Sequence, residues 1–305
     1  QGTMTSGALH SCVLKENGTV FCWGDNGQGR IGSGILPTTQ GAFGTPTQVV
    51  GVNNNGYLED ISQVSAGLAH TCALKTNGTV FCWGTGVYGT LGDNNDSSHY
   101  STTPKQVVGV GGSGYLTDIV QISSRSYNNC ALNTSGNVFC WGYGSGGALG
   151  DGNVANHNSA IPVPVLGADG IGTLSDITQV AVGESHVCAL NTSGNVFCWG
   201  SNGAKALGND SIEGLFSGTP LPVVNEDNDG GYLSEVGSIT AGSHLSCAVK
   251  EDSTAVCWGW GLYGNLGDGD NTDHQTYIPT PVLGEGGSGY LSGISSISAR
   301  GDTHA

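Results

Sequence analysis

The chain is built on Cys72-Ala73-Leu74-Lys75-Thr76-Asn77-Gly78-Thr79-Val80-Phe81-Cys82-Trp83-Gly84, a segment that occurs five times with small changes. Every copy has two cysteines ten positions apart, and the second cysteine is followed by Trp-Gly. Successive copies start 60, 58, 58 and 59 residues apart. A fixed period of this length is the signature of a repeat architecture, so the sequence predicts five units of one kind.

The repeated segment predicts a β-hairpin. Short apolar arms, Ala73-Leu74 and Val80-Phe81, flank a turn rich in Asn and Gly, which is a strong local hairpin signal. If the two cysteines face each other, a three-residue loop remains, and Gly78 falls at its left-handed position. The last unit has Ser253 at this place, so its turn is expected to differ.

The cysteine pairs predict five disulfides, each within one hairpin. Directly opposed residues on antiparallel strands approach to about 4.5–5.5 Å between Cα atoms, which is within disulfide reach. Zinc sites are a rival interpretation, although zinc motifs usually pair cysteines roughly two to four residues apart. Reduced, buried cysteine pairs are the other alternative. The predicted disulfides, which indicate an oxidising compartment, are Cys12–Cys22, Cys72–Cys82, Cys130–Cys140, Cys188–Cys198 and Cys247–Cys257.

Composition narrows the class of partner. The chain has 8 Lys and Arg against 24 Asp and Glu, for a formal net charge of −16. Phosphate binding needs a basic surface, so nucleic acid is not expected as a partner, nor is an acidic membrane surface. No apolar run reaches the roughly 18 residues of a membrane span. No signal peptide is visible, and the first residue, Gln1, is consistent with a removed leader or a fragment.

Each unit contains four strand-like segments. In the second unit, residues 61–66 alternate with period two, residues 71–74 and 80–83 form the hairpin, and residues 104–108 form a fourth strand. The fourth strand begins with a proline, as an outer edge strand can. Four short strands in a unit of this length predict one blade of a β-propeller, so the predicted fold class is all-β.

The repeated motif resembles that of the RCC1 (regulator of chromosome condensation) family. In the second unit the matching elements are Ala66-Gly67-x-x-His70-x-Cys72-Ala73-Leu74, Gly78-x-Val80-x-Cys82-Trp83-Gly84 and Gly89-Thr90-Leu91-Gly92-Asp93. The resemblance covers essentially the whole chain and implies a β-propeller, most often of seven blades. The cysteine pairs are similar to those of secreted microbial members rather than the nuclear exchange factor.

Both ends of the chain match the same strand, because residues 4–10 and 297–304 each align with residues 64–70. We therefore expect five blades and the start of a sixth, as part of a six- or seven-bladed ring. The expected single array over residues 1–305 has repeats at 4–60, 61–118, 119–176, 177–235 and 236–293, with a partial sixth at 294–305.

Two residue types recur once per unit and are predicted to be structural. The tryptophan after the second cysteine should pack between blades. The histidines His10, His70, His186, His244 and His304 should each make a hydrogen bond at one turn. The third unit departs, with Ser124-Arg125-Ser126-Tyr127-Asn128 in place of the Gly and His of the motif. Arg125 and Tyr127 are candidate ligand contacts, with sequence drift as the alternative.

The loops that follow the Leu-Gly motif differ most between units. They should project from one side, and variable loops on a rigid scaffold are the usual binding surface. Their aromatic residues could anchor a partner or pack under their own loops. The candidate anchors are Phe43, Tyr100, Phe216 and Tyr277.

Two acidic runs are candidate calcium sites, because hard oxygen ligands at this spacing suit calcium. Solvated turns are the alternative, and no other cofactor is expected. The calcium candidates are Asp227 and Asp229, and Asp268, Asp270 and Asp273. Candidate acceptors of N-linked glycans are Asn17, Asn77, Asn95, Asn133, Asn191 and Asn209, although Asn and Thr also suit turns.

No catalytic motif stands out: the sequence has no Gly-rich phosphate loop, nucleophile elbow or His-Glu-x-x-His. We therefore expect a secreted or cell-surface, non-enzymatic module for protein interaction, adhesion or extracellular assembly, including self-assembly. A secreted enzyme inhibitor is an alternative that the resemblance to bacterial inhibitor propellers of this family allows. A guanine-nucleotide exchange factor is a third possibility, from family analogy alone.

Overall fold

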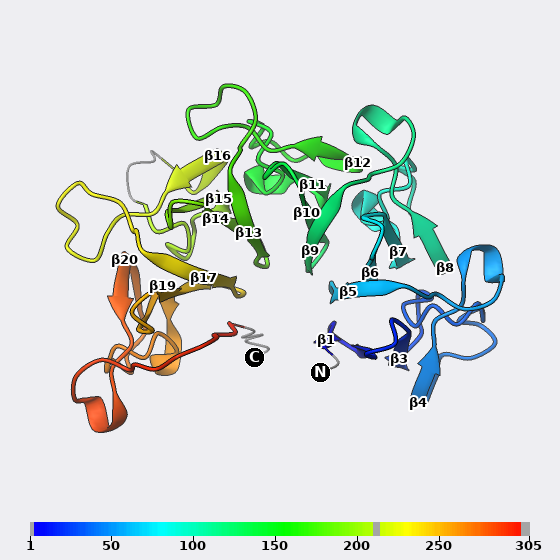
Figure 1. Ribbon diagram of the computed structural model, residues 1–305, viewed down its shortest axis with the longest axis horizontal. Helices are drawn as coiled ribbons and strands as arrows, with labels where there is room; N and C mark the ends of the chain where they lie inside the picture. The colour runs from blue at the N-terminus through cyan, green and yellow to red at the C-terminus, as the bar shows by residue number, and fades with distance from the viewer. Residues whose placement is uncertain (1–2, 210–213, 300–305) are drawn as a thin grey trace. The chain divides into compact units, whose positions relative to one another are not determined.

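The computed structural model describes residues 3–209 and 214–299. These residues form β-strands and short 3-10 helices, and contain no α-helix. None of their helices has the length and apolar character of a membrane span. The strands make five four-stranded sheets (Figure 1). Each sheet belongs to one sequence repeat and is called a blade below, so the predicted all-β fold of four-stranded blades is confirmed.

The strands follow each other in space within every blade as they do along the chain. Blade one contains β1 (Met4–Ser6), β2 (His10–Leu14), β3 (Val20–Asp25) and β4 (Ala42–Gln48). Blade two contains β5 (Ile61–Ala66), β6 (His70–Lys75), β7 (Val80–Thr85) and β8 (Tyr100–Gln106). Blade three contains β9 (Ile119–Arg125), β10 (Asn128–Asn133), β11 (Val138–Tyr143) and β12 (Asn158–Pro164). Blade four contains β13 (Ile177–Val182), β14 (His186–Asn191), β15 (Val196–Ser201) and β16 (Phe216–Pro222). Blade five contains β17 (Val236–Ala241), β18 (Leu245–Lys250), β19 (Ala255–Gly261) and β20 (His274–Pro281).

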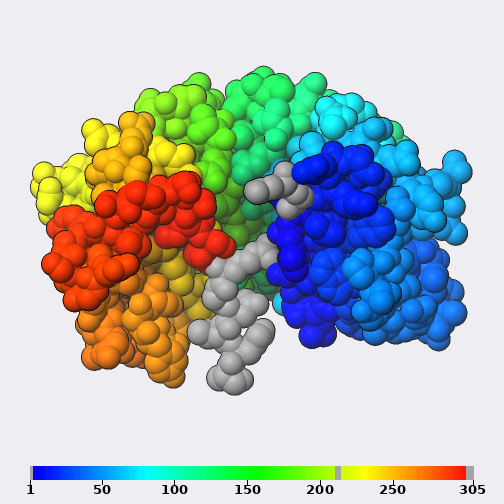
Figure 2. All heavy atoms as spheres, turned by 60° about the horizontal axis from the view of Figure 1, so that its bottom comes forward, coloured from blue at the N-terminus to red at the C-terminus, as the bar shows by residue number. Residues whose placement is uncertain are grey.

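The chain divides into two compact units. Unit one comprises residues 1–134, 139–144 and 157–164, and unit two comprises residues 135–138, 145–156 and 165–305. Within each unit, neighbouring blades pack side by side, as Figure 2 shows for blades one and two in dark blue to cyan and for blades four and five in green to red.

The central hairpin of each blade has the predicted register. In blade two Cys72 pairs with Cys82, Ala73 with Phe81 and Leu74 with Val80. Gly78 has a φ of +79°, in the left-handed region that favours glycine. Ser253 has a φ of +66° at the same place, so the expectation of a different turn in the last unit is wrong. The hairpin register imposes the turn, and serine adopts the left-handed conformation at some cost.

The outer strand begins earlier than predicted. Cys82 pairs with Lys105 but Gly84 pairs with Ser101, so three residues of β8 oppose Trp83 alone. This bulge contains Pro104, which therefore removes no hydrogen bond from the ladder. The strand resumes on the far side of the bulge, and β8 starts at Tyr100 rather than at the proline.

The core lies between neighbouring blades. Trp83, Trp141, Trp199 and Trp258 are fully buried. Trp83 packs with residues of blade one, and Trp141 with residues of blade two. In unit two, Trp258 packs with residues of blade four such as Leu207. A buried tryptophan removes a large apolar area from water, so these contacts stabilise the stacking of blades, as predicted for these four. Trp23 of blade one is only half-buried, so the prediction does not hold for it.

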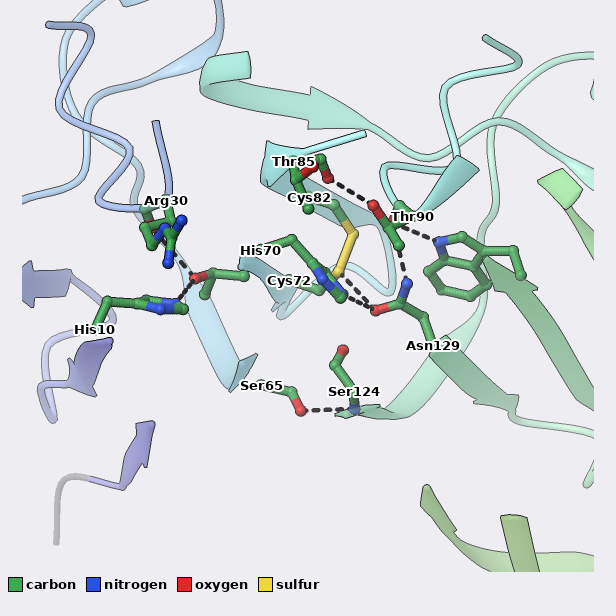
Figure 3. The surroundings of a disulfide bond; sticks show 12 residues. His10, Arg30, Ser65, His70, Cys72, Cys82, Thr85, Thr90, Ser124 and Asn129 are labelled. Atoms are coloured by element: carbon green, nitrogen blue, oxygen red, sulfur yellow. Dashed lines mark hydrogen bonds between the residues drawn. A yellow bond between two sulfur atoms is a disulfide. The ribbon is translucent and has the colours of Figure 1, made fainter. Parts of the chain in front are cut away.

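The innermost strands of neighbouring blades are also joined by hydrogen bonds from backbone to side chain. The backbone N–H of Ser124 donates to Ser65 Oγ at 2.8 Å (Figure 3). The N–H of Ala66 donates to Thr5 Oγ1 at 3.1 Å. In unit two, Gln179 spans the same kind of boundary, because its Oε1 accepts from the N–H of Ile239 at 2.9 Å.

Candidate functional site

All ten cysteines form the five predicted disulfides. Figure 3 shows the bridge between Cys72 and Cys82. Each bridge joins directly opposed residues within one hairpin, so the zinc and reduced-cysteine interpretations are wrong. A disulfide that closes a loop this short stabilises the fold by roughly 2–3 kcal/mol in the chain-entropy model.

The recurring histidine makes the predicted structural hydrogen bond to the next blade. His70 Nε2 lies 2.8 Å from Asn129 Oδ1, and the amide of Asn129 donates to Thr90 O at 3.0 Å (Figure 3). His186 Nε2 lies 2.9 Å from Ser246 Oγ in the same way. The pattern ties each such histidine to the residue that precedes the first cysteine of the following blade.

Burial keeps His70 and His10 neutral. It lowers the pKa of His70 from 6.5 to about 4. The pKa of His10 falls to about 3, chiefly through burial and then through the positive charge of Arg30. A general acid or base works best with a pKa near the operating pH. These side chains therefore serve packing and hydrogen bonding rather than proton transfer.

His244 does not belong to this set, and its prediction as a turn histidine is wrong. Leu245 pairs with Gly259 in blade five as His70 pairs with Gly84 in blade two. His244 precedes that position by one residue and is half-exposed, with its ring 5.5 Å from the ring of Trp260. His304 lies outside the described residues.

The third repeat differs as the sequence indicated. Asn128 takes the place of the histidine and is buried, and neither of its side-chain atoms has a hydrogen-bond partner in the described structure. Tyr127 is half-buried and its ring lies 5.2 Å from that of Tyr88. Arg125 ends strand β9 and is half-buried. Whether Arg125 or Tyr127 contacts a ligand stays a prediction.

The four predicted aromatic anchors lie on outer strands rather than in loops. Phe43 is only 8% exposed and packs in the core of blade one, so its prediction as an exposed anchor is wrong. Phe43 pairs with Gly24, the inward-facing position that the buried Ser101 takes opposite Gly84 in blade two. Tyr100 and Phe216 are 46% and 49% exposed. Tyr277 is half-buried, and its hydroxyl accepts a hydrogen bond from Asn228 at 3.2 Å.

The candidate calcium ligands do not converge. Among residues 3–209 and 214–299, no three His, Cys, Asp or Glu side chains gather in a way that could hold a metal. Asp229 accepts from Asn225 and Gly231, and these hydrogen bonds lower the pKa of its carboxyl. Three further candidates accept hydrogen bonds from their own loop or from a neighbouring strand. These are Asp268 from His274, Asp270 from Thr272, and Asp273 from Trp260.

The sequon asparagines fall into two groups. Asn17, Asn77 and Asn95 are exposed, and Asn133 and Asn191 are half-buried. Asn209 is 5% exposed and its amide donates to Pro222 O at 2.6 Å. A glycan needs an accessible amide, so the prediction of Asn209 as an acceptor is wrong. The other five stay predictions.

Two features escaped the reading of the sequence. One is a set of tyrosines that each form an isolated β-bridge in a link between repeats and are 57–63% exposed: Tyr57, Tyr115, Tyr232 and Tyr290. The recurrence of Gly-Tyr-Leu in the links between repeats could have revealed them. The other is a cavity of about 190 Å³ within unit two, beside His244 and Trp260.

The family model described as an RCC1-like domain matches residues 3–305. The ultraviolet-B receptor UVR8 of Arabidopsis thaliana is 33% identical over 225 residues, which cover 73% of this chain and 46% of the receptor. The human probable E3 ubiquitin-protein ligase HERC6 is 32% identical over 281 residues, which cover 90% of this chain and 24% of the ligase. The chain thus spans less than half the length of either relative.

Solved structures share the fold at lower identity. Human WBSCR16 is 22% identical with a TM-score of 0.75, over 94% of this chain and 68% of that chain. Yeast RCC1 (Prp20), solved in complex with Kap60, is 20% identical with a TM-score of 0.65, over 93% of this chain and 75% of that chain. Five four-stranded blades with these repeats, matched along the chain, place the protein in the RCC1-like domain family.

Proposed function

We propose that this chain is a non-enzymatic protein-interaction module that works outside the cell or on its surface. The observation that carries this proposal is the set of five disulfides, each inside one hairpin. Such bridges persist in oxidising compartments and are rare where glutathione keeps thiols reduced. The fold does not fix the function, since relatives with this domain include a receptor and a ubiquitin ligase.

A protein is the partner class that the surface favours. Yeast RCC1 was solved bound to a protein, Kap60. The net charge of −16 favours partners with basic or neutral surfaces. Exposed aromatic side chains such as Tyr100 and Phe216 are the kind that anchor protein interfaces. Adhesion and self-assembly are forms of this role, and an enzyme inhibitor would be the same module with a hydrolase as its partner.

The compartment is tested by the intact mass of the protein isolated from its native source without reducing agent. A gain of ten hydrogens on reduction is expected, since all 10 cysteines are paired. A mass that falls on enzymatic deglycosylation would add glycans at exposed sequons such as Asn77. Ten free thiols in the native protein would contradict export and favour an intracellular role, such as nucleotide exchange.

The partner class is tested by crosslinking the oxidised chain to intact source cells and identifying what it captures. Tyr100→Ala with Phe216→Ala should reduce capture of a protein partner about tenfold, because such anchors contribute strongly when buried in an interface. Tyr57→Ala is the matched control, since Tyr57 is 57% exposed but belongs to a link between repeats. Capture of no protein by the wild-type chain would overturn the proposal.

A further inference from the structure

Two positions at one end of each hairpin are aromatic in only two blades. One position lies three residues before the first cysteine, and the other two residues after the tryptophan. A backbone hydrogen bond joins them, from Tyr143 N to Tyr127 O in blade three and from Trp260 N to His244 O in blade five. The other three blades have no aromatic ring at either position.

In unit one a side chain of the preceding blade covers the aromatic pair. Tyr88, from the 3-10 helix η2 (Val87–Gly89) of blade two, lies 5.2 Å from Tyr127 and 4.9 Å from Tyr143 between ring centroids. The first of these contacts is edge-to-face, at 82°. Such pairs attract each other beyond the effect of the area that they bury. In unit one, a phenol ring therefore packs against the aromatic pair at these two positions.

In unit two the corresponding residue is too small to do this. By sequence spacing, Ala204 stands five residues after Trp199 in blade four, as Tyr88 stands five residues after Trp83 in blade two. The backbone differs there, because Tyr88 has a φ of +63° and Ala204 has no positive φ. A methyl group does not reach across the space, and the cavity of about 190 Å³ lies there, lined by Ala204, His244 and Trp260. The cavity takes the place of a ring that the sequence of blade four does not supply.

The rest of the lining is Gly203, Ala206, the buried His186 and four polar side chains, and it carries no carboxylate, lysine or arginine. Ser185, Ser201, Ser243 and Gln275 line the cavity. Their hydroxyl and amide groups can donate to and accept from a phenolic hydroxyl. A charged group would lose its hydration without gaining a counter-charge, so this lining favours a neutral ligand.

The aromatic wall is held in place before any ligand arrives. The indole N–H of Trp260 donates to Asp273 Oδ1, and the ring packs against His244 at 49°. A side chain already fixed in this way loses little conformational entropy on binding. The wall is therefore preorganised for a flat ring.

We propose that this cavity binds an aromatic side chain, above all a tyrosine, of a protein partner. The inference rests on the proposed role as a protein-interaction module and names the contact chemistry of one of its sites. Tyrosine is enriched at the energetic centres of interfaces because its ring is large and its hydroxyl finds a partner. Tyr88 fills the corresponding place in unit one and indicates the size and shape of the occupant.

The test uses N-acetyl-L-tyrosinamide as a neutral probe, titrated into the full oxidised chain and followed by NMR at the indole N–H of Trp260. Saturable binding at one site with a dissociation constant of about a millimolar is expected for one side chain. Ala204→Tyr should weaken binding at least about tenfold by filling the cavity. Ala204 has no positive φ, so its backbone accepts a larger side chain. His244→Ala, which removes the ring packed against Trp260 and keeps the reporting indole, should also weaken binding.

A gain-of-function variant makes the test independent of those losses. Tyr88→Ala removes the ring that covers Tyr127 and Tyr143, and should add a second site in unit one. Failure of the probe to saturate the wild-type chain at about ten millimolar would overturn the proposal, as would binding unchanged by Ala204→Tyr. Binding of methyl glucoside but not of the probe would assign the cavity to a sugar instead. A protein partner that wild type and Ala204→Tyr capture equally would contradict the binding role of this cavity and leave the proposed protein-interaction function in place.

Discussion

The boundary between blades two and three is built in the same way as the boundary between blades four and five. In both, a fully buried tryptophan donates its indole N–H to a backbone carbonyl of the preceding blade, from Trp141 to Thr90 and from Trp258 to Ala206. In both, a histidine reaches the residue before the next cysteine. The ends differ, since Tyr88 covers one aromatic pair and Ala204 leaves the other beside a cavity.

The difference shows that one set of residues fixes the distance between neighbouring blades and another decides what the boundary can bind. The tryptophan and histidine hold neighbouring blades at a fixed separation, whatever follows in the turn. The turn residue after the tryptophan then decides only whether a ring-sized space remains. Binding properties can therefore change without loss of the scaffold, as is usual for repeat folds.

The strongest way to break the comparison is to remove the tryptophans. Trp141→Ala and Trp258→Ala should each cost about 3–5 kcal/mol of unfolding free energy, because each deletes a fully buried ring and leaves a void. Denaturant unfolding under non-reducing conditions measures this. Tryptophan to phenylalanine is the milder control at each site. A much smaller loss for one of the two alanine variants would show that the interiors are not equivalent.

Opening the disulfides comes next. Replacing both cysteines of Cys130–Cys140, or both of Cys247–Cys257, by serine should cost roughly 2–3 kcal/mol in each case. The reason is that each bridge constrains only its own hairpin in the unfolded chain. Thermal unfolding of the two double variants checks it. Unequal losses would mean that a disulfide also supports the boundary next to it.

Acid should weaken the boundary that contains His70. Its pKa is about 4 in the folded chain against about 6.5 unfolded, so the unfolded state binds the proton first as pH falls. Stability is then full above pH 6.5 and is lost between pH 6.5 and 4, by about 2 kcal/mol between pH 7 and 5. The measurement is unfolding free energy against pH. His70→Asn, which copies Asn128, should flatten the profile, and an unchanged slope would assign it to other groups.

The smallest expected effect is that of Tyr88→Ala on stability. Tyr88 is partly exposed, so the loss should be about 1 kcal/mol, mostly from its two ring contacts. Chemical denaturation of this variant beside Ala204→Gly, which changes the other boundary by a single methyl group, makes the comparison. A loss of several kcal/mol would show that Tyr88 belongs to the interior after all.

The sequence predicted what the repeat itself specifies. The cysteine spacing with its Asn-Gly turn fixed the hairpin register, and Cys72 faces Cys82 as expected. Repetition also identified four of the five tryptophans as packing residues, all but the half-buried Trp23. These features are local or periodic, so one copy of the motif explains all five.

The sequence did not predict what depends on a neighbouring strand or blade. The register of the outer strand in blade one pairs Phe43 with Gly24 and turns its ring inward, where it is buried. Asn209 looked like an exposed turn residue but its amide is held by Pro222. The cavity beside Trp260 arises from a missing side chain in another repeat. Only a comparison of equivalent positions between repeats could have indicated it.

The hydrogen bond from the backbone N–H of Ser124 to Ser65 Oγ has a consequence for how such a chain grows. Its donor is a main-chain group that every residue except proline supplies. The acceptor side chain in one repeat therefore needs no matched side chain in the repeat that follows. A gene duplication that inserts a whole repeat keeps this link intact without a compensating mutation, whereas the bond of His70 needs a polar side chain such as that of Asn129 in the repeat that follows.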